Sequence, residues 1–182
     1  MGELFEVSRG NVSNKNLLNK NNKGVSFIAQ NETDNGFVYK VEQKNNKLFK
    51  GNAIIVGRQT GIVYFQEKEF ITTDGVLVLI AKNNFIKNRK IGFVLISSIK
   101  KQMQSFCYTN TVSAEKLNKI TIQLPIKNNK IDFDFMDSFI AELEACHIAE
   151  LEACHIAELE AYLLATGLND YILSSEIGRA HV

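Results

Sequence analysis

A perfect tandem repeat constrains this chain more than any other feature. The eight residues from Ile140 to His147, IAELEACH, recur at 148–155, and a divergent third copy follows at 156–163. Alanine, leucine and glutamate are strong helix formers, and Gly167 is of the type that ends a helix. The sequence therefore predicts one helix of about 32 residues, which would span roughly 48 Å. That is far longer than a domain of this size needs.

The repeat places an apolar seam along the predicted helix. An isolated helix would leave this seam in water, so we expect a partner helix from a second copy or from another subunit. Because eight residues turn about 80° beyond two full helical turns, the seam winds around the helix from one copy to the next. The seam residues are Ile140, Leu143, Ile148, Leu151, Ile156 and Leu159.

The chain before this helix predicts an α+β domain with a β-rich core. An amphipathic helix is expected over 86–106, because apolar residues recur there mostly every three to four positions. Ser113 is the predicted N-cap of a short helical turn, and 120–124 a closing strand before the only proline, Pro125. Asparagine-rich loops separate five further runs of β-branched and aromatic residues, which are typical of strands: 25–29, 37–41, 53–56, 62–65 and 76–81.

Charge is segregated along the chain. Through Ile131 there are 20 lysine and arginine residues against 9 acidic residues, whereas the remainder has 1 basic and 11 acidic residues. The basic part attracts a polyanion and the acidic part repels one. Nucleic acid is the first candidate, because neutralised phosphates release counterions. On composition alone, a genome biased toward lysine and asparagine explains the basic part equally well.

One loop has the residue types that read bases. Gly57 and Gly61 flank Arg58, Gln59 and Thr60 in a predicted tight hairpin turn. Arginine pairs with guanine and glutamine with adenine in the major groove, although hairpin closure alone accounts for the glycines. Two lysines at the end of the predicted amphipathic helix are expected to meet phosphates or solvent. The candidate DNA-binding residues are Arg9, Lys23, Arg58, Gln59, Thr60, Lys100 and Lys101.

No residue pattern predicts catalysis, a metal site or a cofactor. The Cys-His pairs of the repeat recur eight residues apart, whereas zinc ligands on one helix lie about four apart. Asp132, Asp134 and Asp137 are expected to favour a helix start. Cys107 has no histidine before it. A single proline excludes the Asp/Asn-Pro-Pro-aromatic motif of amino-methyltransferases, so we expect a non-catalytic protein.

A cytoplasmic location is expected. No apolar run reaches the roughly 20 residues that span a bilayer, so no membrane partner is expected. The first residues lack the basic region and apolar block of a secretory signal. The three cysteines are too few for a disulfide framework, which fits a reducing compartment.

Several segments together resemble the DNA-specificity subunits of type I restriction–modification systems. GELFEVSRG at 2–10, IIVGRQTGIVY at 54–64 and LNKITIQLP at 117–125 are similar to the start, middle and closing strand of a target-recognition domain. The most specific segment is IDFDFM at 131–136 with the helix that follows to Leu168. It is similar to the long spacer helix of these subunits and of type IIB and IIG enzymes. The resemblance covers nearly the whole chain.

The resemblance implies a target-recognition domain over 1–130 and a spacer helix over 131–168. In this family the recognition domain reads one half of a bipartite site in double-stranded DNA. The spacer helices pair as an antiparallel coiled coil that sets the gap between half-sites and docks the methyltransferase subunit. Cleavage belongs to a separate endonuclease subunit. Members usually have two recognition domains, so the single one here implies a homodimer or a second recognition domain in a longer protein.

The eight-residue repeat then has the role of a length adjuster for the spacer, because one copy can be gained or lost without changing side-chain chemistry. The tail at 169–182 is assigned no function, and EIGRAHV at 176–182 matches a translated sequencing adapter. An alternative interpretation is a structural adaptor, in which the coiled coil matters and the basic domain binds another ligand. Steep salt dependence of duplex DNA binding would distinguish the two.

Overall fold

Two strands that are buried on both faces organise the fold. Each is a run of apolar residues, AIIVG in β4 (Ala53–Gly57) and VLVLIA in β7 (Val76–Ala81). All five residues of β4 are buried, and so are all but one of β7. Strands with this continuous apolar pattern need cover on both sides. The computed structural model describes residues 1–168, and the tail with its adapter-like segment lies outside the described residues.

A four-stranded antiparallel sheet forms around this pair, in the order β1-β7-β4-β5. Its edge strands are β1 (Phe5–Arg9) and β5 (Val63–Gln66). A second sheet has the order β3-β2-β6, in which β6 runs parallel to β2. Its strands are β2 (Lys20–Ile28), β3 (Phe37–Val41) and β6 (Phe70–Thr72). A small hairpin pairs β8 (Ile126–Lys127) with β9 (Lys130–Ile131).

Three α-helices and three single-turn 3₁₀ helices complete the described chain. The side chain of Asn88 caps α1 (Arg89–Met103) by accepting from the Ile91 amide at 3.1 Å. Ser113 caps α2 (Ala114–Lys119) in the same way, accepting from the Lys116 amide at 3.2 Å. The long helix is α3 (Phe133–Thr166). The 3₁₀ helices are η1 (Lys15–Leu17), η2 (Asp34–Gly36) and η3 (Lys82–Asn84).

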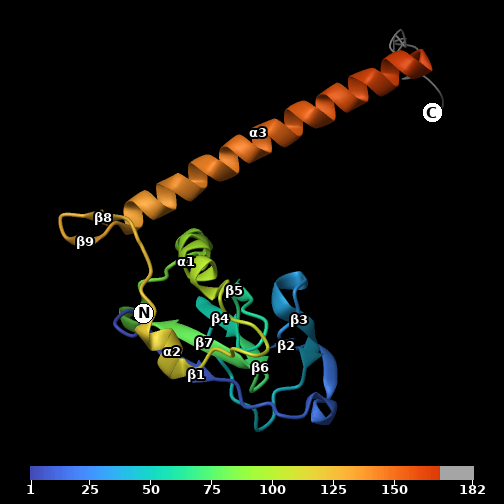
Figure 1. Cartoon of the computed structure of the whole chain (residues 1–182). Helices are drawn as coiled ribbons and strands as arrows, with labels where there is room; N and C mark the ends of the chain where they lie inside the picture. Colours follow the sequence, from blue (N-terminus) through green and yellow to red (C-terminus); the bar gives the residue numbers. More distant parts are fainter. Residues whose placement is uncertain (169–182) are drawn as a thin grey trace, which may run out of the picture. The chain divides into compact units, whose positions relative to one another are not determined.

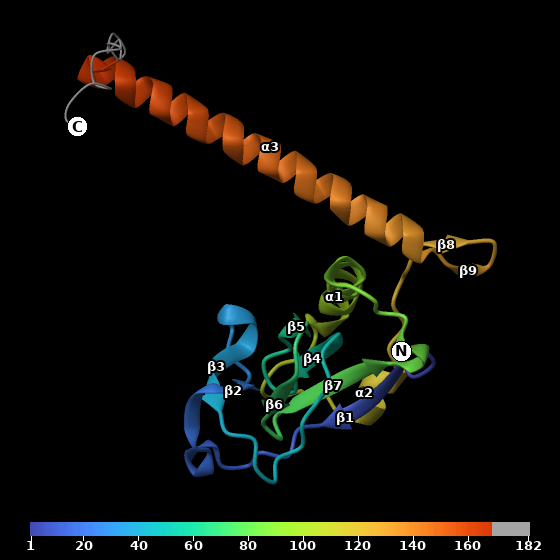
Figure 2. The same cartoon turned by 180° about the vertical axis from the view of Figure 1, so that it is seen from behind.

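Alternation along β4 and β7 builds a separate core on each face of the large sheet. Ile54 and Leu79 belong to the core under α1, together with Leu95 of that helix. Their neighbours Ile55 and Val78 belong to the core shared with the three-stranded sheet. Figures 1 and 2 show α1 and the β2–β3 ribbon on different sides of β4 and β5. The result is three layers, helix on sheet on sheet.

The structure confirms most of the predicted elements and shows four strands that were not predicted. All five predicted strands are present, and the 53–56 and 62–65 runs pair as a hairpin. The predicted helix over 86–106 begins three residues later and ends three earlier. The four strands without a prediction are β1, β6 and the two short strands of the small hairpin, β8 and β9.

The strand predicted at 120–124 is wrong. This segment is extended but pairs with no strand. Ile120, Ile122 and Leu124 are partly buried against the core under α1, which produces the alternating pattern. Its backbone groups bond elsewhere: the Ser98 hydroxyl donates to the Gln123 carbonyl at 2.9 Å, and the N-terminal ammonium donates to the Ile120 carbonyl. Burial alternation without a neighbouring strand therefore misled the prediction.

The ends of α3 follow the sequence expectations. Asp132 accepts a hydrogen bond from the Phe135 amide at 2.9 Å, as a helix-capping carboxylate does. Gly167 follows the last turn with φ of +69°, a conformation that favours glycine. Met136 in the second turn is the one buried residue of this helix. Five of the six predicted seam residues are solvent-exposed in this chain, at 50–57% for Leu143, Ile148, Leu151, Ile156 and Leu159, whereas Ile140 is half-buried.

The chain divides into two compact units, Met1–Ile140 and Ala141–Val182. The first includes the opening turns of α3, because Met136 packs in the core under α1. The division at 130 that the sequence suggested stays a prediction. Within residues 1–168, no helix is both long enough and apolar enough to cross a membrane.

A substitution at Gly92 tests the packing between α1 and the large sheet. A Cβ at this position would lie 2.7 Å from Cδ2 of Phe65, whose side chain is buried. Alanine raises helix propensity by about 1 kcal/mol, but overpacking a core costs about 1–3 kcal/mol. We expect Gly92→Ala to lower the free energy of unfolding by roughly 1 kcal/mol in urea denaturation.

The matched control is Ser97→Ala at an exposed position of the same helix. Its hydroxyl donates only to the Phe93 carbonyl within the helix, at 3.0 Å. This control should change the free energy of unfolding by less than about 0.5 kcal/mol. A Gly92→Ala chain as stable as the original would contradict the packing described here.

Candidate nucleic-acid interface

The turn between β4 and β5 presents three of the predicted DNA-binding residues. The Gly57 amide donates to the Ile62 carbonyl at 2.9 Å and the Gly61 amide donates to the Gly57 carbonyl at 3.0 Å. The turn is thus closed by its own backbone, which confirms the predicted hairpin. Gln59 and Thr60 at its tip are exposed, and Arg58 is half-buried.

Arg58 is tied at its backbone and at one side-chain nitrogen. Its amide donates to the Gly75 carbonyl at 3.0 Å, and its carbonyl accepts from the Val112 amide at 2.8 Å. Its Nε donates back to the Val112 carbonyl at 3.2 Å. Within residues 1–168 the terminal Nη groups donate to no other group, so the end of the guanidinium fork is available. A guanidinium group that is fixed at Nε and free at its two Nη atoms is suited to donate two parallel hydrogen bonds to a pair of acceptor atoms.

Arg9, at the end of β1, pairs with the turn between β6 and β7. Its Nε donates to the Asp74 carbonyl at 2.6 Å, and its Nη2 lies 3.4 Å from Asp74 Oδ2. The side chains of Arg9 and Asp74 are 52% and 47% exposed. An ion pair this exposed contributes at most about 1 kcal/mol to stability. Its main effect is to hold both charges at one position beside the turn of Arg58.

Gln30, just after β2, connects these two turns. Its Oε1 accepts a hydrogen bond from the Gln59 amide at 2.9 Å. A Cβ at residue 75 would lie 2.4 Å from Nε2 of Gln30, so Gly75 leaves the space that the amide occupies. Gln30 therefore anchors the tip of the β4–β5 turn through one bond to its backbone.

These residues line one open cleft of about 550 Å³. It offers guanidinium donors from Arg9 and Arg58, an acceptor from Asp74, and amides that both donate and accept. This mixture matches the donors and acceptors on base edges in the major groove. The polar and charged side chains that line the cleft are those of Arg9, Ser13, Asn14, Lys15, Asn16, Gln30, Arg58, Gln59, Thr73, Asp74 and Thr111.

The structure brings together only part of the predicted site. Arg9, Arg58 and Gln59 line the cleft, and Thr60 belongs to the same turn. Lys23 lies exposed on β2 and outside the cleft lining. Lys100 and Lys101 are exposed in the last turn of α1, also outside it. A DNA contact at any of these seven residues stays a prediction.

Sequence reasoning missed several cleft residues. Asp74 stands before Gly75 between two apolar runs, a pattern that favours a hairpin turn and was available in the sequence. Gln30 and Thr111 lie 29 residues before and 52 residues after Gln59 in the chain, and no local signal connects them with it. Lys15 is one lysine among many in the basic part.

A second cleft, of about 560 Å³, lies beside η3 and the first turns of α3. Its lining includes the carboxylates of Asp134 and Asp137, which would repel phosphate. Asp137 accepts from Asn88 Nδ2 at 2.6 Å and lies 3.8 Å from the Lys90 ammonium, so it is already paired. The cleft of Arg9 and Arg58 is therefore the candidate for nucleic acid.

No metal centre is evident in the described part of the chain. Residues 1–168 contain no group of three or more histidine, cysteine, aspartate or glutamate side chains arranged to hold an ion. Cys107, Cys146 and Cys154 are all exposed free thiols. Hydrogen bonds lower the pKa of the Cys107 thiol, first from the Thr109 side chain and then from backbone amides. None of these groups contacts the candidate cleft.

Comparison with known proteins points to one family. The family model of the type I restriction modification DNA specificity domain matches residues 1–153. A similar curated protein is the specificity subunit S.BcgI of a type II restriction enzyme from Heyndrickxia coagulans. The two are 28% identical over 145 residues, which cover 79% of this chain and 42% of that subunit.

Solved structures show the same fold at low sequence identity. The HsdS subunit from Thermoanaerobacter tengcongensis is 11% identical with a TM-score of 0.63, over 94% of this chain and 44% of that one. The S subunit of a type I restriction–modification system from M. genitalium is 16% identical with a TM-score of 0.58, over 95% and 46%. The chain thus spans less than half the length of each of these relatives.

Replacing Gln30 tests how the tip of the turn is held. In Gln30→Leu the Gln59 amide loses its acceptor, and a hydrogen bond of this kind is worth about 1 kcal/mol. We expect hydrogen exchange of the Gln59 amide to become roughly fivefold faster in NMR measurements. Gln30→Glu keeps an acceptor oxygen and should keep the slow exchange. Equal rates in all three proteins would show that Gln30 does not anchor the turn.

Proposed function

Since the chain belongs to the family of type I restriction modification DNA specificity domains, we propose that it reads one half-site of a bipartite DNA target. The observation that carries this proposal is the cleft in which Arg9, at the end of β1, meets Arg58 and Gln59 of the β4–β5 turn. Arginine and glutamine are the side chains that pair bidentately with guanine and adenine. The excess of basic residues up to Ile131 supports a duplex as the ligand, through contacts to its phosphates.

Within this proposal the candidate DNA-binding residues have two roles. The free end of the Arg58 guanidinium and the side-chain amide of the exposed Gln59 contact base edges. Arg9 exchanges its half-exposed pair with Asp74 for a DNA phosphate or base acceptor, and this exchange costs little because the ion pair is weak. Lys23, Lys100 and Lys101 add phosphate contacts that position the duplex without reading sequence.

We further infer that the protein acts without chemistry of its own, in the cytoplasm. Methylation is carried out by a modification subunit that this chain directs to its site, and cleavage by an endonuclease subunit. Helix α3 serves as the spacer and pairs through its seam with the same helix of a second copy, or with its counterpart in a second recognition domain. The exposure of about half of each seam residue from Leu143 to Leu159 supports a partner helix.

Duplex binding as a function of salt tests the proposal. If six or more phosphates are neutralised, the association constant should fall on the order of a thousandfold between 50 and 200 mM salt. Binding should be measured for the full chain alone and with a co-expressed modification subunit. Salt-independent binding, or none in either preparation, would favour the adaptor interpretation with another ligand for the basic domain.

The same binding assay distinguishes residues that contact bases from residues that contact phosphates. Arg58→Ala should lose discrimination at one base pair by about 1–3 kcal/mol. Lys23→Ala should weaken binding to all sequences alike and reduce the salt slope by about 1. Identical profiles for both variants would remove Arg58 from the base contacts.

Deleting residues 148–155 tests the spacer. Eight helical residues correspond to about 12 Å, or roughly three to four base pairs of duplex at 3.4 Å each. We expect the deletion to shorten the gap between recognised half-sites by about this amount and to leave the half-site sequence unchanged. Sequencing that maps methylated bases in cells carrying the system measures both quantities.

The matched control keeps the length and changes the chemistry. Cys154→Ser with His155→Ala alters the same repeat copy without removing residues, and it should preserve the gap. An unchanged gap after the eight-residue deletion would refute the role of α3 as a spacer, while leaving DNA reading by the first unit open to its own test.

A further inference from the structure

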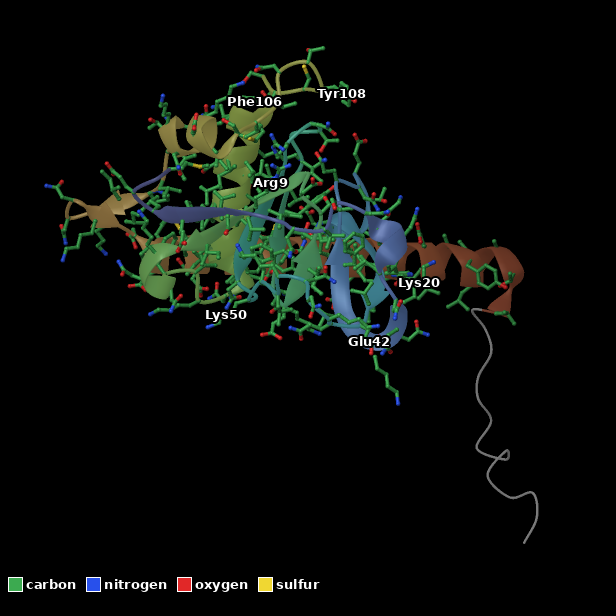
Figure 3. The ribbon with its side chains drawn as sticks, turned by 90° about the horizontal axis from the view of Figure 1, so that it is seen from below. Arg9, Lys20, Glu42, Lys50, Phe106 and Tyr108 are labelled. Carbon is green, nitrogen blue, oxygen red and sulfur yellow. The ribbon has the colours of Figure 1, made fainter. Side chains whose placement is uncertain are left out.

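The loop after α1 forms a small hairpin with an aromatic tip. The Cys107 amide donates to the Asn110 carbonyl at 3.2 Å, and the Asn110 amide donates to the Cys107 carbonyl at 3.0 Å. Asn110 Nδ2 also donates to the Ser105 carbonyl at 3.1 Å. Tyr108 is therefore held between two paired residues. Figure 3 shows Phe106 and Tyr108 on this loop, away from Lys20 and Glu42.

Lys116 of α2 fixes this hairpin from one side. Its ammonium donates to Asn110 Oδ1 and to the Thr111 carbonyl, both at 3.0 Å. The same ammonium lies 5.8 Å from the centroid of the Phe106 ring. Phe106 is thus half-buried and occupied by internal contacts. Tyr108 is 76% exposed, the highest value among the large hydrophobic side chains that are exposed in residues 1–168.

The hairpin is joined directly to the candidate cleft. Thr111, which follows Asn110, lines the cleft with Arg9 and Arg58. The next residue, Val112, exchanges two hydrogen bonds with Arg58: its amide donates to the Arg58 carbonyl and its carbonyl accepts from Arg58 Nε. The base of the hairpin and the residue with the free guanidinium end are therefore one hydrogen-bonded unit.

An exposed tyrosine in a braced hairpin contributes little to folding, because its ring buries almost no area. The same ring offers an apolar face that can pack on a deoxyribose or on a thymine methyl group of a duplex, and burying such a ring is worth about 1.5–3 kcal/mol. Tyrosine has few rotatable bonds, so ordering it on binding costs little entropy. These properties favour a contact residue over a structural one.

We propose that residues 106–110 form a second DNA-contacting arm beside the cleft, with the Tyr108 ring packed against a nucleotide of the bound duplex. The inference rests on the proposed function, because it uses the same duplex in the same cleft. It adds an apolar contact to a surface that otherwise recognises DNA through charges and hydrogen bonds. That contact carries no charge, so it strengthens binding without changing the number of counterions released.

Substitution at Tyr108 distinguishes this contact from an electrostatic one. We expect Tyr108→Ala to weaken binding of duplex DNA about tenfold, as the loss of a buried apolar contact does, with an unchanged slope against salt. Tyr108→Phe keeps the apolar ring and should bind within about twofold of the original protein. The matched control is Ile126→Ala in the β8–β9 hairpin, where an exposed apolar side chain (71%) is also removed. This control should bind normally.

Cys107 gives a second, independent readout beside Tyr108. Its thiol is exposed, and hydrogen bonds lower its pKa, which favours the thiolate that reacts with an alkylating reagent. Bound cognate duplex should slow alkylation of Cys107 several-fold, while Cys146 and Cys154 on α3 should react at the same rate with and without DNA. Mass spectrometry of the three cysteine peptides in the full chain measures all rates at once.

The outcomes separate this inference from the function on which it rests. If the original protein binds duplex DNA, but Tyr108→Ala binds equally well and Cys107 reacts at an unchanged rate, the second arm is refuted and the cleft remains. A weakening of the same size in Ile126→Ala would also overturn it, because the effect would not be specific to this hairpin. If no duplex binds, the proposed function fails and this inference fails with it.

Discussion

Burial of β4 and β7 on both faces is the constraint on which the candidate site depends. A strand covered on one side by α1 and on the other by a second sheet cannot shift its register without exposing one set of apolar side chains. The turns at 57–61 and 73–75 are fixed to the ends of these two strands. The two strands therefore set the distance between Arg58 and Asp74. The hydrogen bonds from the Gln59 amide to Gln30 and from Arg58 Nε to Val112 add local support to the β4–β5 turn.

The sequence predicts elements whose pattern reflects that double burial. The runs of β4 and β7 are continuous and apolar, and both were found with nearly correct limits. β1 was missed although Phe5 and Val7 alternate with polar residues as in a half-buried strand, because so short an alternation is a weak signal. β6 was missed because three residues are too few for a periodic signal. The segment at 120–124 failed in the opposite way. Its alternation is real, but a strand also needs a neighbour to accept its hydrogen bonds, and only tertiary structure supplies one.

The candidate site was predictable only where it is local. Arg58, Gln59 and Thr60 stand between two glycines in five residues of chain, so a turn could be inferred from them alone. Their surroundings come from far away: Gln30 is 29 residues from Gln59, and Val112 is 54 from Arg58. Such contacts depend on which strands become neighbours in the sheet. The parallel pairing of β2 with β6, which carries residue 30 toward this end of the fold, leaves no pattern in either segment.

The two units differ in how they tolerate change, and this bears on how specificity evolves. In the described chain the last buried residue is Met136, and residues 142–168 are largely exposed, so a repeat can be added or removed there without opening a cavity in the core. In the first unit, even a methyl group at Gly92 meets the ring of Phe65. Between these extremes lie Gln59 and Tyr108, at the exposed tips of two turns. Their side chains contribute little to packing, and backbone hydrogen bonds at the foot of each turn hold them in place. Substitutions at such tips change which ligand groups are met without a penalty in stability. Under the proposed function, the half-site that is read and the gap between half-sites would change through separate, structurally independent substitutions.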